Sequence, residues 1–373
     1  MHRPLRRVLT LAALILAVTS ARAALQTQNI VGGLTPTDLV NAILGSGVAI
    51  SNVSLRGCET GLGTFTGGTG IIDLESGLVM SSGNIASAVG PNQFTGISTT
   101  CEGEGDSDLN ALVSPLGTFD SAVLEFDFVP TGSTVAFQYV FASEEYNEFV
   151  NVQYNDVFAF FVNGENFALL PGTSNAVAVN NVNLDTNALL YHDNDLQPGP
   201  RDTEADGLTQ VLSFTAPVNA GQTNHIKLAI ADTSDNAYDS WIFVGASSLS
   251  STTADVAIEE KGKAIVLNVD IGETGKGLGF IEGAGFALLP TGSAAIVSAG
   301  VITNPPGLSV VTKKPDKQRK FNKKGRAKLR LKLNPSGKQL LKQQGELPAL
   351  VIVNVTDKDG KSVNFQKLVK FRR

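Results

Sequence analysis

Apolar residues occur along this chain mostly in short runs that alternate with polar positions, which is the pattern of half-buried β-strands. The segment AVLEFDFVP at 122–130 alternates Leu and Phe with acidic residues. It therefore predicts a strand with one buried face and one face whose central residues are exposed to solvent. VFAFFV at 157–162 is followed by Asn163-Gly164, a hairpin-turn signal. HIKLAIAD at 225–232 and SWIFVGASSL at 240–249 predict two further strands.

One segment has the helical period instead. Residues 36–44 carry an apolar stripe, Thr35 is placed to cap them, and Pro36 occupies the first helical position. Such segments are too few for an α/β sheet. The chain is therefore predicted to be mainly β. Residues 24–250 are expected to form a jelly-roll-like β-sandwich that includes the one N-terminal helix. Residues 251–373 are expected to form a second, smaller Ig-like β-sandwich.

The prediction for the second module rests on two patterns. RAKLRLKLNPSG at 326–337 alternates Leu with Lys or Arg, which predicts a strand with one apolar and one cationic face. LPALVIVNVTDKDGKSVNFQKLVKF at 347–371 predicts two strands around an Asp359-Gly360 turn. With NPSGKQLLKQQG between them, this order resembles the small Ig-like β modules appended to many exported bacterial proteins, and the resemblance implies a fold only.

The start of the chain has the features of a secretory signal peptide. Arg3, Arg6 and Arg7 precede an apolar run at 8–18, and Ala21-Arg22-Ala23 supplies the small residues of a cleavage site, so residues 1–23 are predicted to be removed. No later apolar run reaches about 18 residues, so no transmembrane segment is expected in the mature chain. The predicted location is secreted or extracellular, free or associated with the cell surface.

The two cysteines, Cys58 and Cys101, fit that location. After export, an isolated pair most simply forms one disulfide, and the alternative is two free thiols. No other Cys and no His lies near either one in the sequence, so a thiolate metal site is not predicted. A disulfide would close a loop of ~44 residues and stabilise the fold by about 3–4 kcal/mol.

The net charge of −6 conceals two oppositely charged modules. Residues 312–373 hold 19 Lys and Arg against 4 Asp and Glu, whereas residues 24–311 hold 6 against 31. The basic end predicts either an exposed face that is basic without further role, or a surface for anionic polymers such as cell-wall polyanions, acidic polysaccharides or membrane headgroups. Nucleic acid is not an expected partner, because few aromatic residues interleave the basic ones.

A more specific resemblance rests on YVFASEEYNEFVNVQYNDVFAFFVNG at 139–164, in which FASEEY is followed by NDVFAFF. SGLVMSSG at 76–83, GEGDSDLNAL at 103–112 and KLAIADTSDNAYDSWIFV at 227–244 accompany it. In this order the motifs resemble the choice-of-anchor L domain of exported bacterial proteins over about 29–250. The resemblance implies export, a β fold and a surface-associated role, without a known enzymatic activity. Members of the family attach to the surface by differing C-terminal signals, and here attachment is expected through the basic module or not at all.

The acidic residues of this domain need a counter-charge. Acidic residues gather at 144–156, at 231–240 and at 103–108, and residues 24–311 hold only 6 Lys and Arg with which to pair them. Buried unpaired carboxylates are very costly. Calcium takes 6–8 oxygen ligands and would resolve the imbalance. The candidate ligands for Ca²⁺ are Glu144, Glu145, Asn155, Asp156, Asp232, Asp235 and Asp239.

The spacing is not that of an EF-hand, so such a site must be assembled from separate loops. Strand neighbours point to opposite faces, so Glu144 and Glu145 are not expected on one ion, and Glu145 is favoured with Asp156, Asp235 and Asp239. Two alternatives stay open. The acids can be solvated turn formers, or a pair of carboxylates ~5–9 Å apart can hydrolyse a glycosidic bond.

Nucleophilic catalysis is poorly supported. No G-x-S-x-G motif surrounds a serine, His192 lies in a polar loop and is expected to be exposed, and His225 opens a strand. Trp241 begins an apolar run and is expected in the core, with stacking on a sugar as the alternative. The prediction is an exported binding or structural protein rather than an enzyme, whose partner is a surface glycan, an anionic polymer or another surface protein. A glycan-active hydrolase is the alternative.

Overall fold

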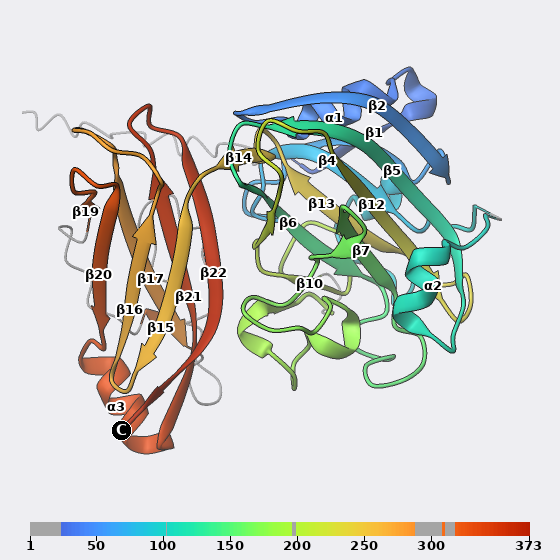
Figure 1. The fold of residues 1–373 in the computed structure, drawn as a ribbon. Coiled ribbons are helices and arrows are strands. Elements are labelled where there is room, and N and C mark those ends of the chain that lie inside the picture. The colour runs from blue at the N-terminus through green and yellow to red at the C-terminus, as the bar shows by residue number, and fades with distance from the viewer. Residues whose placement is uncertain (1–23, 102, 196–198, 288–307, 310–317) are drawn as a thin grey trace, which may run out of the picture.

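The structure, a computed structural model, describes residues 24–101, 103–195, 199–287, 308–309 and 318–373. The predicted signal peptide at 1–23 lies outside the described residues. Two sets of antiparallel sheets follow one another along the chain, and Figure 1 shows the larger, N-terminal set beside the smaller, C-terminal one. The prediction of a mainly β protein built as a β-sandwich is confirmed.

The first sandwich has a nine-stranded and a five-stranded sheet. The larger sheet runs in the order β1 (Gln26–Asn29), β3 (Leu62–Thr66), β4 (Ser76–Ser81), β13 (Ser240–Gly245), β6 (Thr134–Ser143), β10 (Gly207–Thr209) and β9 (Tyr191–Asp193), with β11 (Leu212–Pro217) and β14 (Ser250–Thr252) also paired to β6. The smaller sheet runs in the order β2 (Val48–Gly57), β5 (Thr118–Pro130), β12 (Asn224–Thr233), β7 (Val157–Val162) and β8 (Glu165–Asn166).

The alternation read from the sequence explains how these sheets pack. On β5, Leu124, Phe126 and Phe128 point into the core between the sheets, while Glu125 and Asp127 stay partly exposed on the other face. The core between the sheets is rich in aromatic rings, which come from β6 and β7 as well as β5. The predicted turn at Asn163-Gly164 joins β7 to β8, and both residues have positive φ, which matches the twist of a tight hairpin.

The predicted N-terminal helix is α1 (Pro36–Ile43). The Thr35 side chain accepts a hydrogen bond from the Asp38 N–H, and the Asp38 carboxylate accepts one from the Thr35 N–H, so these two backbone donors are satisfied reciprocally. The described residues also include α2 (Ser107–Val113), which Asp106 caps, and α3 (Pro335–Gln344). Short 3₁₀ turns lie at Ile30–Gly32, Ile85–Ala88, Val179–Asn181 and Ala188–Leu190.

The C-terminal module is a second, smaller sandwich. One sheet is β15 (Asp255–Lys261), β16 (Ala264–Asp270) and β20 (Arg326–Lys332). The other is β18 (Leu308–Ser309), β17 (Phe280–Ala287), β21 (Glu346–Thr356) and β22 (Ser362–Arg372), with β19 (Arg319–Lys320) also paired to β17. The strand predicted at 326–337 is present as β20 but ends at Lys332, and residues 335–337 begin α3 instead. The two strands predicted at 347–371 are present as β21 and β22. That this module is Ig-like stays a prediction.

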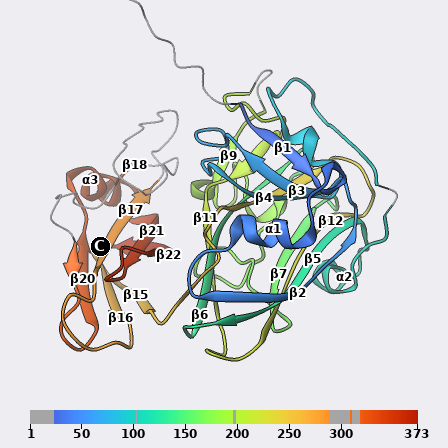
Figure 2. The same ribbon diagram turned by 90° about the horizontal axis from the view of Figure 1, so that it is seen from above.

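The two faces of β21 show how the modules meet. Val351 and Val353 belong to the core of the C-terminal module, whereas Leu350 and Ile352 join the core of the first sandwich. The Gln366 side chain of β22 accepts a hydrogen bond from the Ser213 N–H at 3.0 Å. The sheet that contains β21 therefore lies between the first sandwich and the β15–β16–β20 sheet, whose outer face points away from the first sandwich, as Figures 1 and 2 show.

Candidate metal centre

The acidic segments meet because four strands end at one edge of the first sandwich. Ser143 at the end of β6 pairs with Ser240 at the start of β13, and just beyond them the Glu144 N–H donates to the Asp239 carbonyl at 3.1 Å. In the opposite sheet, Asp156 directly precedes β7, and Asp232 lies near the end of β12. The Ser240 hydroxyl links the two sheets, because it donates to Oδ2 of Asp156 at 2.7 Å.

Where these four strands end, five of the buried carboxylates at this edge are each at most 1% exposed. We call them the acidic centre: Glu144, Glu145, Asp156, Asp232 and Asp239. None of the five takes part in an ion pair with a Lys, Arg or His among the described residues. Removing charged carboxylates from water without a counter-charge is strongly unfavourable, so these groups must be neutralised by protons or by a cation.

Backbone and hydroxyl donors satisfy only part of the acidic centre. Oδ1 of Asp156 accepts from the Thr233 N–H at 3.0 Å, and one oxygen of Glu144 accepts from the Ile97 N–H at 2.8 Å. Within the acidic centre, three carboxylate oxygens have no hydrogen-bond partner among the described residues, namely Oε1 of Glu144, Oε2 of Glu145 and Oδ1 of Asp232. Orphaned hard oxygens of this kind fit the donor set that Ca²⁺ takes.

Glu144 and Glu145 belong to different parts of the centre. Burial raises the pKa of Glu144 to about 9, and the nearby acids that add to this shift are Asp206, Glu204 and Asp239. Burial raises the pKa of Glu145 to about 10, and its acidic neighbours begin with Asp156. The two sets of neighbours do not overlap, so the side chains diverge in the bend that follows β6.

Asp156 and Asp232 interact directly within the acidic centre. Burial raises the pKa of Asp156 to about 7, although hydrogen bonds from Ser240 and Thr233 oppose the shift. Burial also raises the pKa of Asp232 well above its usual range, and the charge of Asp156 adds to the effect. Two carboxylates in contact favour either a shared proton or a shared cation.

The remaining two predicted ligands are only half-buried. Oδ1 of Asn155 accepts a hydrogen bond from the Asn180 N–H at 2.8 Å, so this amide holds a neighbouring loop. Oδ1 of Asp235 accepts from the Ala237 N–H at 3.2 Å, which is a turn-forming contact, and the Asp235 charge also acts on Glu145. These two side chains lie at the rim of the acidic centre.

The acids at 103–108 have a different partner. Lys227, 7% exposed on β12, donates to both oxygens of Asp106 at 2.8 and 2.7 Å and to Asp108 at 2.6 Å. Arg56 also contacts Asp106. Burial opposes ionisation of Asp106, but the bonds to Lys227 and Arg56 outweigh it and lower its pKa. This cluster is therefore neutralised by the protein itself and needs no metal ion.

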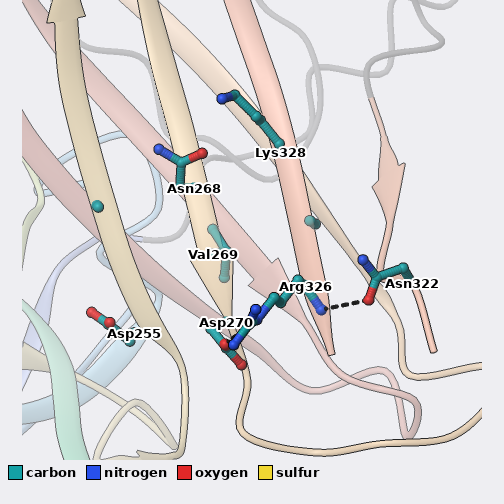
Figure 3. A pocket seen from close by; sticks show the side chains of 9 residues that line it. Asp255, Asn268, Val269, Asp270, Asn322, Arg326 and Lys328 are labelled. Carbon is teal, nitrogen blue, oxygen red and sulfur yellow. Dashed lines mark hydrogen bonds and ion pairs between the residues drawn. The ribbon is translucent and has the colours of Figure 1, made fainter. Parts of the chain in front are cut away.

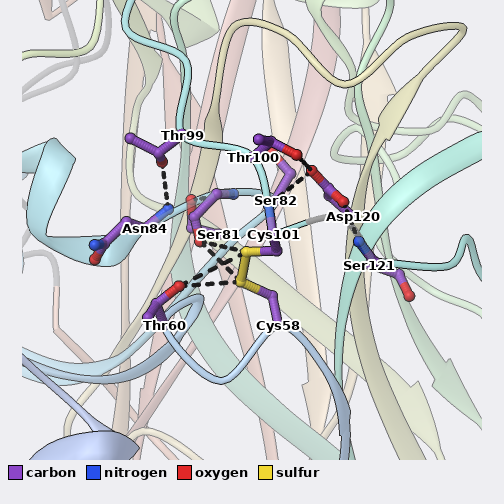
Figure 4. The surroundings of a disulfide bond; sticks show 12 residues. Cys58, Thr60, Ser81, Ser82, Asn84, Thr99, Thr100, Cys101, Asp120 and Ser121 are labelled. Atoms are coloured by element: carbon purple, nitrogen blue, oxygen red, sulfur yellow. Dashed lines mark hydrogen bonds between the residues drawn. A yellow bond between two sulfur atoms is a disulfide. The ribbon is translucent and has the colours of Figure 1, made fainter.

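The predicted disulfide is present. Cys58 and Cys101 are bonded, with their Cα atoms 5.6 Å apart (Figure 4). Asp120 accepts hydrogen bonds from the Thr100 hydroxyl at 2.9 Å and from the Cys101 N–H at 3.0 Å. The segment that ends at Cys101 is therefore held by Asp120 as well as by the disulfide. The segment that ends at Cys101 carries Ile97 and Thr99, whose N–H groups bind the acidic centre.

The histidines and the tryptophan do not mark a catalytic site. Nε2 of His192 lies 2.9 Å from Nη2 of Arg201, and burial lowers the His192 pKa to about 3, so this ring is neutral and held in place rather than exposed. The ring of exposed His225 lies 2.9 Å from Oδ1 of Asp127. Trp241 is fully buried in the core, as expected.

Sequence reasoning missed one group of acids at the same edge. Glu148, Asp195 and Asp206 each bring a carboxylate oxygen to within 4.8 Å of the other two. In the part of the chain that the structure describes, no three of the predicted acidic ligands come this close together. The only signal in the sequence is the acid-rich Y-H-D-N-D at 191–195, and nothing in it points to Asp206.

Comparison with known proteins places the first sandwich in a family. The family model described as the choice-of-anchor L domain matches residues 27–250, which is more than half of the chain, so the protein belongs to this family. Membership indicates an exported, surface-associated protein. Among the described residues, no helix is long and apolar enough to cross a membrane.

Other comparisons add little. No curated protein matches this chain. A solved structure of a β-glucuronidase from an uncultured Clostridium species aligns over 68% of this chain and 37% of its own, with 9% identity and a TM-score of 0.16. This chain thus spans little more than a third of that protein's length, and a similarity this weak carries no argument about fold or activity.

Proposed function

We propose that the protein is a non-catalytic binding or structural component of the cell surface, that Ca²⁺ in the acidic centre stabilises its first sandwich, and that its C-terminal module binds an anionic polymer. The observation that carries the calcium proposal is the burial of five carboxylates that form no ion pair with a cationic side chain of the described residues. If a cation is absent, several of them must hold protons near neutral pH, because burial raises their pKa values. Calcium is plentiful outside cells and accepts such hard oxygen ligands.

The residues that would hold the ion are Asp156 and Asp232, which interact directly. Glu145, whose oxygen is orphaned, would move closer to both as the ion binds. Glu144 has different acidic neighbours and is not included. The bound ion would supply charge neutralisation rather than chemistry. It would tie the ends of β7 and β12 to the segment that follows β6, and so join the two sheets of the sandwich.

Thermal unfolding of the full chain with Ca²⁺ or with EDTA tests this proposal, because a ligand of the folded state raises its melting temperature. Asp232→Asn removes the charge of one proposed ligand at constant shape, and Asp185→Asn, at an acid outside the acidic centre, is a matched control. We expect a calcium-dependent rise in the wild type and the control, and a smaller rise in Asp232→Asn. An equal rise in all three proteins would remove the acidic centre as the site.

The proposal for the C-terminal module rests on the outer face of β20. Every second residue of this edge strand is an exposed cation, while the alternate residues face the core of the module; the cations are Arg326, Lys328, Arg330 and Lys332. Residues i and i+2 on a strand are ~6.6–6.8 Å apart, so the charges form a regular row. A row of this kind suits a linear polymer with repeated negative charges, and we take an acidic polysaccharide as the partner.

The row borders two shallow grooves. One, of about 370 Å³, is lined by residues of β15, β16 and β20 that include Asn268 and Lys328, as Figure 3 shows. The other, of about 490 Å³, adds Arg319 and Lys320 from β19. Arg326 is paired with Asp270 at 2.7 Å, but Lys328 and Arg330 form no ion pair among the described residues. Their charges are therefore available to a partner.

A glycan-active hydrolase is the alternative function, since Glu145 has the raised pKa of a general acid and lies near Asp156. The two side chains are only 1% exposed, which leaves a sugar no direct access to them. A hydrolysis screen of the wild type against Glu145→Gln and Asp156→Asn decides the question. Turnover in the wild type that both substitutions abolish would establish the enzyme and overturn the binding function.

A further inference from the structure

A second cluster of acids is brought together by the strand register rather than by the sequence. Gly207, at the start of β10, pairs with Ser143 at the end of β6 and with Asp193 at the end of β9. The chain that follows β6, the chain that follows β9 and the chain that precedes β10 therefore emerge at one edge of the sheet. Glu148, Asp195 and Asp206 lie on these three segments, and their carboxylate oxygens meet within 4.8 Å of one another. We call them the second acid cluster.

Asp206 is the buried member of this cluster, and one of its oxygens lacks a partner. Its carboxylate is 1% exposed, and Oδ1 accepts a hydrogen bond from Nδ2 of Asn92 at 2.6 Å. Oδ2 of Asp206 has no hydrogen-bond partner among the described residues, and neither has Oδ1 of Asn92, which is also fully buried. A buried orphaned oxygen is costly, so a ligand at this place would relieve a real penalty.

No basic side chain neutralises the cluster. Among the described residues, none of the ion pairs includes Glu148, Asp195 or Asp206. Three carboxylate groups whose oxygens lie within 4.8 Å of one another, without a basic side chain beside them, attract a counter-ion.

Neutral side chains position one member of the cluster, Asp195, by hydrogen bonds. Nδ2 of Asn147 lies 3.1 Å from Oδ1 of Asp193 and 3.4 Å from Oδ2 of Asp195. The Tyr191 hydroxyl donates to Oδ1 of Asn147 at 2.9 Å and fixes the direction of that amide. Partners of this kind orient carboxylates in metal sites, since they bind one oxygen and leave the other free.

We propose that Glu148, Asp195 and Asp206 form a cation site that takes Ca²⁺, separate from the acidic centre. All three donors are hard oxygens, and the buried Asn92 oxygen is a fourth of the same class next to Asp206. Glu148 is exposed and Asp195 half-buried, so the ion can enter from solvent and complete its shell of 6–8 oxygens with water. Ligands from three separate segments suit the variable coordination of Ca²⁺ better than that of Mg²⁺, which demands near-ideal octahedral geometry.

Calcium titration of the full chain by calorimetry, with terbium luminescence as a second readout, tests the proposal. Tyr191 contacts the residue that orients Asp195, so its ring is placed to transfer excitation to a bound lanthanide. Glu148→Gln changes an exposed side chain and should not disturb folding. We expect it to weaken binding at one site at least tenfold and to lower the tyrosine-sensitised terbium signal. Glu165→Gln, at an exposed acid on the β7–β8 hairpin, is the matched control and should bind as the wild type does.

Asp206→Asn separates a binding role from a structural one. It keeps the shape that Asn92 contacts and removes a buried charge, so the melting temperature in EDTA should stay equal or rise while one calcium site is lost. Calcium binding at full stoichiometry in both Glu148→Gln and Asp206→Asn would overturn the proposal. If Asp232→Asn removes all calcium binding and Glu148→Gln removes none, the second acid cluster is excluded and the acidic centre stands. The reverse result supports the second acid cluster and excludes the acidic centre.

Discussion

The backbone N–H of Thr99 donates to Oδ1 of Asp239 at 2.9 Å, and Thr99 lies two residues before a disulfide-bonded cysteine. The N–H of Ile97 donates in the same way to Glu144 at 2.8 Å. One short segment, anchored at Cys101, therefore supplies donors to two of the five buried carboxylates. The disulfide links the stability of the fold to the stability of the acidic centre, because it fixes the end of that segment.

Replacing both cysteines by alanine should destabilise the protein by about 3–4 kcal/mol, as expected for a crosslink that closes a loop of roughly this length. Urea unfolding of the double variant and the wild type at the same calcium concentration measures the loss. Since the segment also binds Asp239 and Glu144, the variant should in addition show a larger destabilisation at pH 8 than at pH 5. A loss that is the same at both pH values would separate the disulfide from the acidic centre.

The metal-free protein should become less stable as the pH rises. Burial raises the pKa of Asp239 to about 6, of Asp156 to about 7 and of Glu144 to about 9, whereas in the unfolded chain these groups titrate near pH 4. The folded protein thus holds more protons than the unfolded chain between about pH 4 and pH 9, and the free energy of unfolding falls across that window.

Melting temperatures in EDTA from pH 5 to pH 9 check this slope. Saturating Ca²⁺ should flatten or reverse it, because the ion binds the deprotonated carboxylates and competes with protons. A metal-free protein that becomes more stable between pH 5 and pH 8 would contradict the protonated state of the acidic centre.

Lys227→Met should destabilise the protein by about 3 kcal/mol whether or not calcium is present, because it leaves buried Asp106 with Arg56 as its remaining cation. Methionine preserves the apolar stem of the lysine. Lys263→Met, at an exposed lysine, is the control and should change the free energy of unfolding little. Equal effects of the two substitutions in urea unfolding would show that the ion pair contributes nothing.

The sequence predicted those parts of the fold that depend on local patterns. The alternation on β5, the Thr35 cap and the Asn163-Gly164 turn each act over a few residues, so they could be read directly. Helix α2 was missed because its start depends on a single capping residue, Asp106, and on burial of Leu109 against the sheet.

The site was harder to predict, because it depends on contacts between residues that are far apart in the sequence. Glu144 and Glu145 have different neighbours, but the expectation rested on strand alternation, whereas both residues lie in the bend after β6. The pairing of Lys227 with Asp106 joins residues 121 positions apart. The second acid cluster depends on the pairing of Gly207 with two strands at once, which only the tertiary structure specifies.

Neutralising the row of cations on β20 should weaken binding to an acidic polysaccharide. Lys328→Gln with Arg330→Gln removes two exposed charges that form no ion pair among the described residues, and we expect about a tenfold loss of affinity for polygalacturonate at low salt. Lys358→Gln with Lys361→Gln makes the same charge change at the β21–β22 turn and serves as the control. Binding of the wild type should fall as salt screens the row. If both double variants bind as the wild type does, the cations serve only to keep this edge strand from pairing with another sheet.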